Sequence, residues 1–164
     1  RVLAAPLPTF CVQLNLEGIA NSQQTLSSVR VRIVHSQNNT DTVDATSTSS
    51  NTGKVTIADS ALDSITANHD LWVKPAGFTA VVMKNLAPSV FSSTNCQTLP
   101  MAYFGDLDKN GSVLKADYDL LLRHIRGIAL NQTLTDLFGT NKLPFRITSL
   151  LVRNIIMGRK DAVL

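Results

Sequence analysis

Hydrophobic and polar residues alternate along the first part of the chain in a way that predicts β-strands. Across residues 9–19, apolar and polar side chains alternate, as in a strand with one buried face. The apolar positions are Phe10, Val12, Leu14 and Leu16. Val29, Val31 and Ile33 alternate with two arginines and predict a second strand.

Further short apolar runs follow, and turn-forming residues separate them. Residues 43–45, 55–57, 71–74 and 78–83 are expected strands, with turns at 51–54 and 75–77 and a short helix or turn at 59–65. Short strands at this spacing are typical of antiparallel sandwiches. We therefore expect an Ig-like β-sandwich over residues 9–100. It follows an apolar N-terminal extension, residues 1–8, that could pack on a neighbouring subunit or fold back on its own domain.

The pattern changes to a helical period after residue 100. Residues 101–104 are strand-like, and a helix after them would carry one apolar face made of Leu120, Leu121, His124, Ile125 and Ile128. A second apolar helix is expected over residues 147–158. Residues 101–164 are therefore predicted to form a small helical module, joined to the sandwich by so short a link that the two pack rigidly.

Between the strand-like residues 101–104 and the first expected helix lies a loop whose oxygen-bearing side chains recur at every second position. Asp106, Asp108 and Asn110 occupy loop positions one, three and five, and Gly111 follows where the backbone must turn sharply. Asp117 closes the loop at position twelve. This is the ligand spacing of an EF-hand-type calcium loop, in which the Ser112 carbonyl would serve at position seven.

The loop predicts one Ca²⁺ site of modest affinity. Leu114, at position nine, has no side-chain oxygen, so a water must serve there. Without a cation, the three carboxylates would repel one another. The alternative is an Asp/Asn/Gly-rich turn that binds no metal.

The loop and its helix resemble one repeat of a dockerin. The resemblance rests on Gly105-Asp106, Val113, Asp117, the leucines at 120–122, Arg123 and Gly127, and on the lack of an entering helix. It covers residues 103–158 and implies a second repeat. The helix of that repeat matches, but its loop has lost the acidic ligands and carries Lys142 and Pro144. We therefore expect one calcium ion.

The first half is similar, at family level, to the transthyretin-like and Cna-B-like sandwiches of surface proteins. The matching features are the valine-rich run at 29–34, the turn from Thr52 to Val55, and Leu71, Val73, Gly77 and Phe78. These motifs are short and are shared with Ig-like sandwiches. The resemblance implies a surface protein.

The two cysteines, Cys11 and Cys96, lie near the two ends of the sandwich. We expect a disulfide that ties its first strand to its last; the alternative is two separate buried thiols. A modest calcium loop also suits a calcium-rich, oxidising exterior. The chain begins with Arg1 rather than Met, so we expect a secreted chain whose leader has been removed, or an internal fragment.

The composition of the chain and the motifs that it lacks argue against several classes of function. The net charge of +3 arises on the C-terminal helices, without aromatic interleaving or a nucleic-acid motif, and no apolar run reaches membrane-spanning length. The three histidines are scattered, and no catalytic or phosphate-binding motif occurs. We expect no enzyme, nucleic-acid partner or membrane span.

Two functions fit these features. The first is a calcium-stabilised structural subunit of an extracellular assembly or filament, with copies of itself or other surface proteins as partners. The second is a dockerin-type attachment module that binds a cohesin-like protein or a carbohydrate-associated complex. Lys115-Ala116 stands where the dockerin resemblance would place a Ser/Thr pair, which favours the first function.

Overall fold

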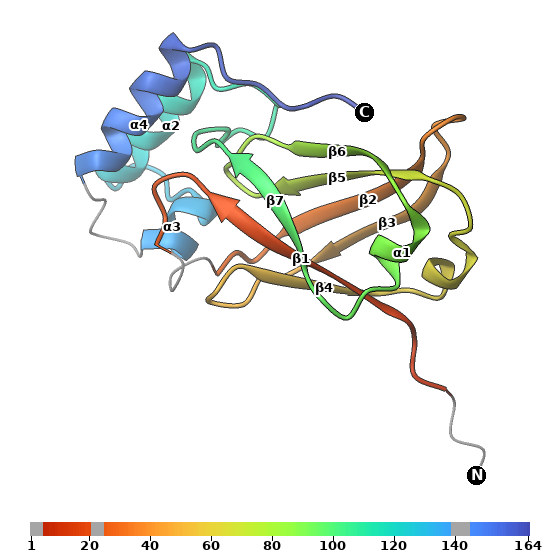
Figure 1. Ribbon diagram of the computed structural model, residues 1–164. Coiled ribbons are helices and arrows are strands. Elements are labelled where there is room, and N and C mark those ends of the chain that lie inside the picture. The colour runs from red at the N-terminus through yellow and green to blue at the C-terminus, as the bar shows by residue number, and fades with distance from the viewer. Residues whose placement is uncertain (1–4, 21–24, 139–144) are drawn as a thin grey trace.

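Two β-sheets pack face to face, and a group of helices covers one end of them (Figure 1). The computed structural model describes residues 5–20, 25–138 and 145–164. One sheet has the order β4-β1-β7, formed by Lys54–Ala58, Thr9–Leu16 and Gln97–Ala102. The other has the order β3-β2-β5-β6, formed by Asp41–Ser47, Val29–His35, His69–Pro75 and Val81–Leu86. The helical elements are η1 (Ser60–Ser64), α1 (Pro88–Phe91), α2 (Lys115–Ile125), α3 (Gln132–Phe138) and α4 (Phe145–Ile156).

The inner faces of the two sheets form the core that the alternating pattern predicts. All four apolar positions of β1 are buried, and they face buried side chains of β2 and β5 such as Ile33 and Leu71. Burying β-branched and aromatic side chains between two sheets is the main stabilising contribution in such a fold. The predicted two-sheet, mainly β architecture is confirmed.

The sandwich differs from the expected antiparallel form at β7. This strand runs parallel to β1, with Val12 opposite Gln97, whereas the other strand pairs are antiparallel. The chain leaves the four-stranded sheet after β6, crosses through α1 and returns beside β1. A parallel partner requires such a crossover. The observed strand, β7, begins earlier than the strand expected over residues 101–104. The expected domain boundary at residue 100 lies inside β7.

The predicted disulfide is present and joins these two strands. Cys11 on β1 is bonded to Cys96, just before β7, with 4.5 Å between their Cα atoms. The first and last strands of the sandwich are thus covalently linked across a sequence separation of 85 residues.

The helices follow the prediction in part. α2 and α4 lie where they were expected and pack side by side in Figure 1, whereas α3 was not predicted. Leu121 and His124 are buried, but Ile125 and Ile128, expected on the same apolar face, are exposed. α2 ends at Ile125, and Gly127 adopts a φ of 65°. This left-handed residue ends the helix, so Ile128 after it leaves the buried face, and Ile125 is the exposed last residue of α2.

The helices and the sandwich share one continuous core. Buried residues of the helical part, including Val113, Leu121 and Leu151, belong to the same apolar cluster as the sandwich residues. A polar contact reinforces this junction. The buried carboxylate of Glu17, just after β1, accepts hydrogen bonds from Asn154 on α4 and from the Phe104 N–H. The loop of residues 105–117 is therefore held between two packed parts.

Candidate metal centre

The loop begins against the sandwich, which fixes the position of its first acidic residue. Thr79 N–H donates to the Tyr103 carbonyl at 2.8 Å, and Gly105 N–H donates to the Gly77 carbonyl at 2.9 Å. Gly105 has a φ of 133°, and a Cβ there would lie 2.5 Å from Leu151 Cδ1. Glycine is required for this close packing, and Asp106 follows it directly into the buried side of the loop.

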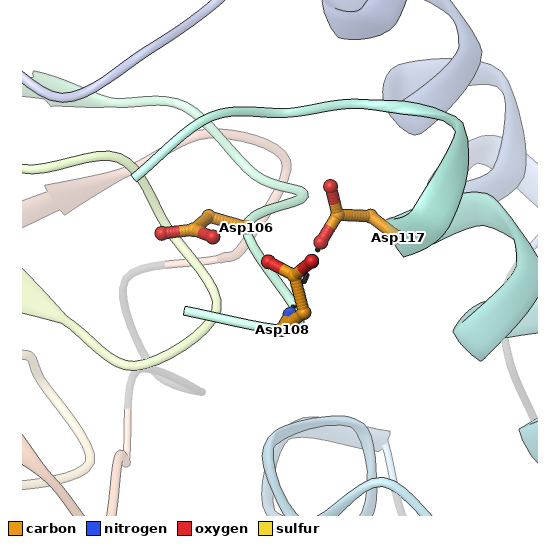
Figure 2. A group of neighbouring side chains, drawn as sticks. All are labelled: Asp106, Asp108 and Asp117. Carbon is orange, nitrogen blue, oxygen red and sulfur yellow. Dashed lines mark hydrogen bonds between the residues drawn. The ribbon is translucent and has the colours of Figure 1, made fainter. Parts of the chain in front are cut away.

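Three predicted carboxylates come together in space. Asp106, Asp108 and Asp117 each offer one oxygen, and these oxygens lie within 4.8 Å of one another. Figure 2 shows Asp106 and Asp117 on opposite sides of the group, with Asp108 between them. Asp106 and Asp117 are buried and Asp108 is exposed, so the cluster opens to solvent on one side.

Backbone N–H groups of the loop orient these carboxylates. Asp117, in the first turn of α2, accepts from Leu107 N–H at 2.7 Å and from Leu114 N–H at 2.8 Å. Asp108 accepts from the backbone and side-chain amides of Asn110. The turn between them needs left-handed backbone at Lys109 and Gly111, with φ of 65° and 88°. The expected sharp turn at Gly111 is therefore present.

One buried oxygen of the cluster, on Asp106, has no partner in the described part of the chain. Asp106 Oδ2 accepts from Gly111 N–H at 3.2 Å, but Asp106 Oδ1 is buried and accepts no hydrogen bond within the described residues. Leaving a buried carboxylate oxygen unsatisfied is costly. A hard cation takes carboxylate, amide and carbonyl oxygens, so these residues fit a calcium ion.

The two buried carboxyls are electrostatically unfavourable as ions. Burial raises the pKa of Asp106 above its usual range, although the Lys74 ammonium opposes part of the rise. Burial also raises the pKa of Asp117, against the effect of the backbone N–H groups that it accepts from. A bound cation would favour the ionised form of both groups.

The remaining predicted ligands lie at the rim of the loop. Asn110 is exposed, and its Oδ1 accepts from Ser112 N–H at 2.9 Å. Ser112 forms an isolated β-bridge with Lys160. That Asn110 and Ser112 act as calcium ligands remains a prediction. The loop of the expected second repeat, with Lys142 and Pro144, lies outside the described residues.

Two residues that the sequence did not assign to the site are part of its surroundings. Lys74 of β5 donates from Nζ to Asp106 Oδ2, and also to Asp161 Oδ1 at 2.5 Å. In sequence, Lys74 is 32 residues from Asp106 and 87 residues from Asp161. No local spacing signals such contacts.

A second feature is an apolar surface at the C-terminal end of α4, which includes Met157 just after the helix. Val152, Ile156 and Met157 are exposed, and with Thr148, Ser149 and Arg153 they line a shallow apolar depression. Ile156 is 78% exposed and Met157 59% exposed. Such exposed side chains gathered on one helix mark a contact surface more often than scattered single residues do.

Comparison with solved structures shows the fold of the chain. A crystal structure of a type II cohesin-X-dockerin complex from Acetivibrio cellulolyticus, a C-terminal interface mutant, contains a chain that matches with a TM-score of 0.58 and 13% identity. The match covers 93% of this chain and 97% of the other. The N-terminal interface mutant of that complex matches with a TM-score of 0.55 and 13% identity, over 89% and 94% of the two chains.

The sequence itself matches no protein-family model and no curated protein. At 13% identity, the structural likeness concerns the fold. None of the helices within the described ranges is long and apolar enough to cross a membrane.

Proposed function

We propose that the protein is a non-catalytic, calcium-stabilised subunit of an extracellular protein assembly. Its helical face contacts the neighbouring subunit. The observation that carries this proposal is the exposed apolar surface of α4, formed by Val152, Ile156 and Met157. Removing such a surface from water is the main driving force for protein association. The structural neighbours belong to protein–protein complexes, which supports a protein as the partner.

Calcium is proposed to stabilise the junction on which this surface depends. Asp106 lies beside the sandwich, and Asp117 begins α2, which packs against α4. An ion held by Asp106, Asp108, Asn110, the Ser112 carbonyl and Asp117 would therefore link the sandwich to the helical face. Extracellular calcium sites of this type bind with Kd values on the order of 10⁻⁴ M or somewhat tighter.

The N-terminal segment supplies a candidate second contact. Residues 5–7 are exposed, and Figure 1 shows residues 5–8, before β1, directed away from the sandwich. Pro8 is tied to the body through its carbonyl, which accepts from Asp59 N–H at 3.1 Å. The apolar residues of the N-terminal segment would pack on an adjacent subunit. Deletion of residues 1–8 tests that contact separately from the contact made by α4.

The proposal is tested by measuring the assembly state with and without calcium. Wild-type protein in calcium is expected to form oligomers or filaments, seen by light scattering after gel filtration and by negative-stain microscopy. The double variant Ile156→Ser with Met157→Ser should be monomeric. Val163→Ser is the matched control, because Val163 is 79% exposed but lies in the C-terminal tail. A wild-type protein that stays monomeric at high concentration in calcium contradicts self-assembly.

An attachment module is the second candidate, favoured by the cohesin-X-dockerin complexes among the neighbours. In that case the chain would be monomeric alone and would bind a purified cohesin through the same helical face. Titration of wild type and of the double variant with a panel of cohesins separates the two functions.

A further inference from the structure

Lys74 is an enclosed lysine on the outer face of a sandwich strand, where side chains are usually exposed to solvent. It belongs to β5, between buried Val73 and buried Pro75, so it points to the outer face of the sheet. That face is covered here, and the Lys74 side chain is only 14% exposed. Its ammonium contacts two carboxylates, Asp106 of the loop and Asp161 of the C-terminal tail.

The second carboxylate is held in place independently of Lys74. Asp161 Oδ1 accepts from Ala80 N–H at 2.7 Å, and Asp161 N–H donates to the Gly111 carbonyl at 2.7 Å. Ala162 N–H donates to the Ala80 carbonyl at 3.1 Å. The tail therefore runs between the calcium loop and β6, and Asp161 would remain near Asp106 if the lysine were removed.

The charges around the loop do not balance. Three loop carboxylates and Asp161 lie in this region, and the enclosed Lys74 ammonium contacts two of these four groups, Asp106 and Asp161. Lys74 uses Asp106 Oδ2, the oxygen that also accepts from Gly111, and Asp106 Oδ1 has no partner among residues 5–20, 25–138 and 145–164. The ammonium thus neutralises Asp106 through Oδ2, while Oδ1 is the oxygen left for a cation.

We infer that Lys74 is the fixed counter-ion of the calcium loop and sets its calcium affinity. This inference rests on the calcium site of the proposed function. Without calcium, Lys74 offsets the repulsion between Asp106 and Asp161 and holds the loop against the sandwich. With calcium, the same positive charge lies beside a divalent cation and weakens its binding. Asp161 acts in the opposite direction, since its negative charge screens the ammonium from the ion.

Removing the charge of Lys74 and removing the charge of Asp161 are predicted to change the calcium affinity in opposite directions. Isothermal titration calorimetry with CaCl₂ measures both changes. Lys74→Met is expected to bind calcium about tenfold more tightly than wild type, and Asp161→Asn about tenfold more weakly. The double variant should lie between them, and Lys74→Arg, which keeps the charge, should stay close to wild type. If Lys74 only supported the fold, both single variants would bind more weakly. That outcome would overturn the inference.

A second readout needs no calcium. In EDTA, Lys74→Met should lose protease resistance in α2 and α4 at a lower temperature than wild type, because Asp106 and Asp161 then face each other without a cation. Asp161→Asn should lose less. Equal behaviour of Lys74→Met and wild type in EDTA would contradict the counter-ion role.

Two controls separate the possible failures. If wild type shows no calcium heat, the calcium site of the proposed function is wrong and the inference falls with it. If wild type binds calcium but Lys74→Met does not bind more tightly, only the inference is wrong. Intact mass must show no loss of one water relative to the disulfide-bonded chain. Such a loss would mean that Lys74 is joined to a carboxyl by an amide and carries no charge.

Discussion

Asn154 should be among the most sensitive positions in the contact between the sandwich and the helices. Its side chain is 0% exposed and donates to Glu17 Oε2 at 2.5 Å and to the Phe104 carbonyl at 2.8 Å. Asn154→Ala removes both donors and leaves the buried Glu17 carboxylate with fewer partners. Because α4 connects to the sandwich through these bonds, the variant should loosen the whole helical end.

The expected cost follows from the two lost hydrogen bonds. A bond to a charged group contributes about 1.5–3 kcal/mol and a neutral bond about 0.5–1.5 kcal/mol. Asn154→Ala should therefore lower the free energy of unfolding by about 2–4.5 kcal/mol. Arg153→Ala is the matched control, since Arg153 contacts the same carboxylate but its side chain is 53% exposed. Because the Arg153 guanidinium is half exposed and Asn154 still bonds to Glu17, we expect Arg153→Ala to cost less than Asn154→Ala, about 1 kcal/mol.

Urea unfolding at saturating calcium measures both variants, and hydrogen exchange locates the change. Exchange should rise in α4 and in residues 103–107 for Asn154→Ala, with β2 and β5 unchanged. A smaller loss for Asn154→Ala than for Arg153→Ala would refute the argument that the buried amide, and not the ion pair, holds the junction.

Three further outcomes are expected. Replacing Cys11 and Cys96 by serine should destabilise the chain by about 4–5 kcal/mol, measured by denaturant unfolding, because a sequence separation of 85 residues is closed by the bond. Gly77→Ala should lower the melting temperature, since its φ is 79° and the new Cβ would lie 2.3 Å from Thr133 Cγ2. Burial alone would raise the pKa of Asp70, but hydrogen bonds from a serine hydroxyl and a backbone N–H hold it below its usual range. Its stabilisation is therefore full above pH ~4 and is lost as the pH falls further. The stability difference between wild type and Asp70→Asn should shrink in acid, and a constant difference would count against this.

The strands could be predicted because their signal is local. Alternation over residues 9–19 and the turn at Gly53 each depend on neighbours in sequence, and β1 and β4 formed as expected. The direction of β7 could not be predicted in this way. Its pairing depends on α1, on Cys96 and on an edge position that tolerates Pro100.

In the site, too, the features set by local sequence could be predicted and those set by tertiary contacts could not. The loop spacing brought Asp106, Asp108 and Asp117 together as predicted, because the turn at Gly111 and the start of α2 are local features. The enclosure of Lys74 was not predictable, because strand alternation alone places it on a solvent-facing surface. Only the tertiary course of the C-terminal tail covers it.

The central claim is that this loop binds calcium and holds the helical face in place. Calorimetric titration of the intact, disulfide-bonded chain with CaCl₂ tests it most directly, alongside Asp106→Ala and the control Asp119→Ala, an exposed acid paired with Lys115. We expect one ion per wild-type chain with a Kd on the order of 10⁻⁴ M or tighter, no binding to Asp106→Ala, and unchanged binding to Asp119→Ala. Absence of calcium heat in wild type, or equal binding by Asp106→Ala, would contradict the account.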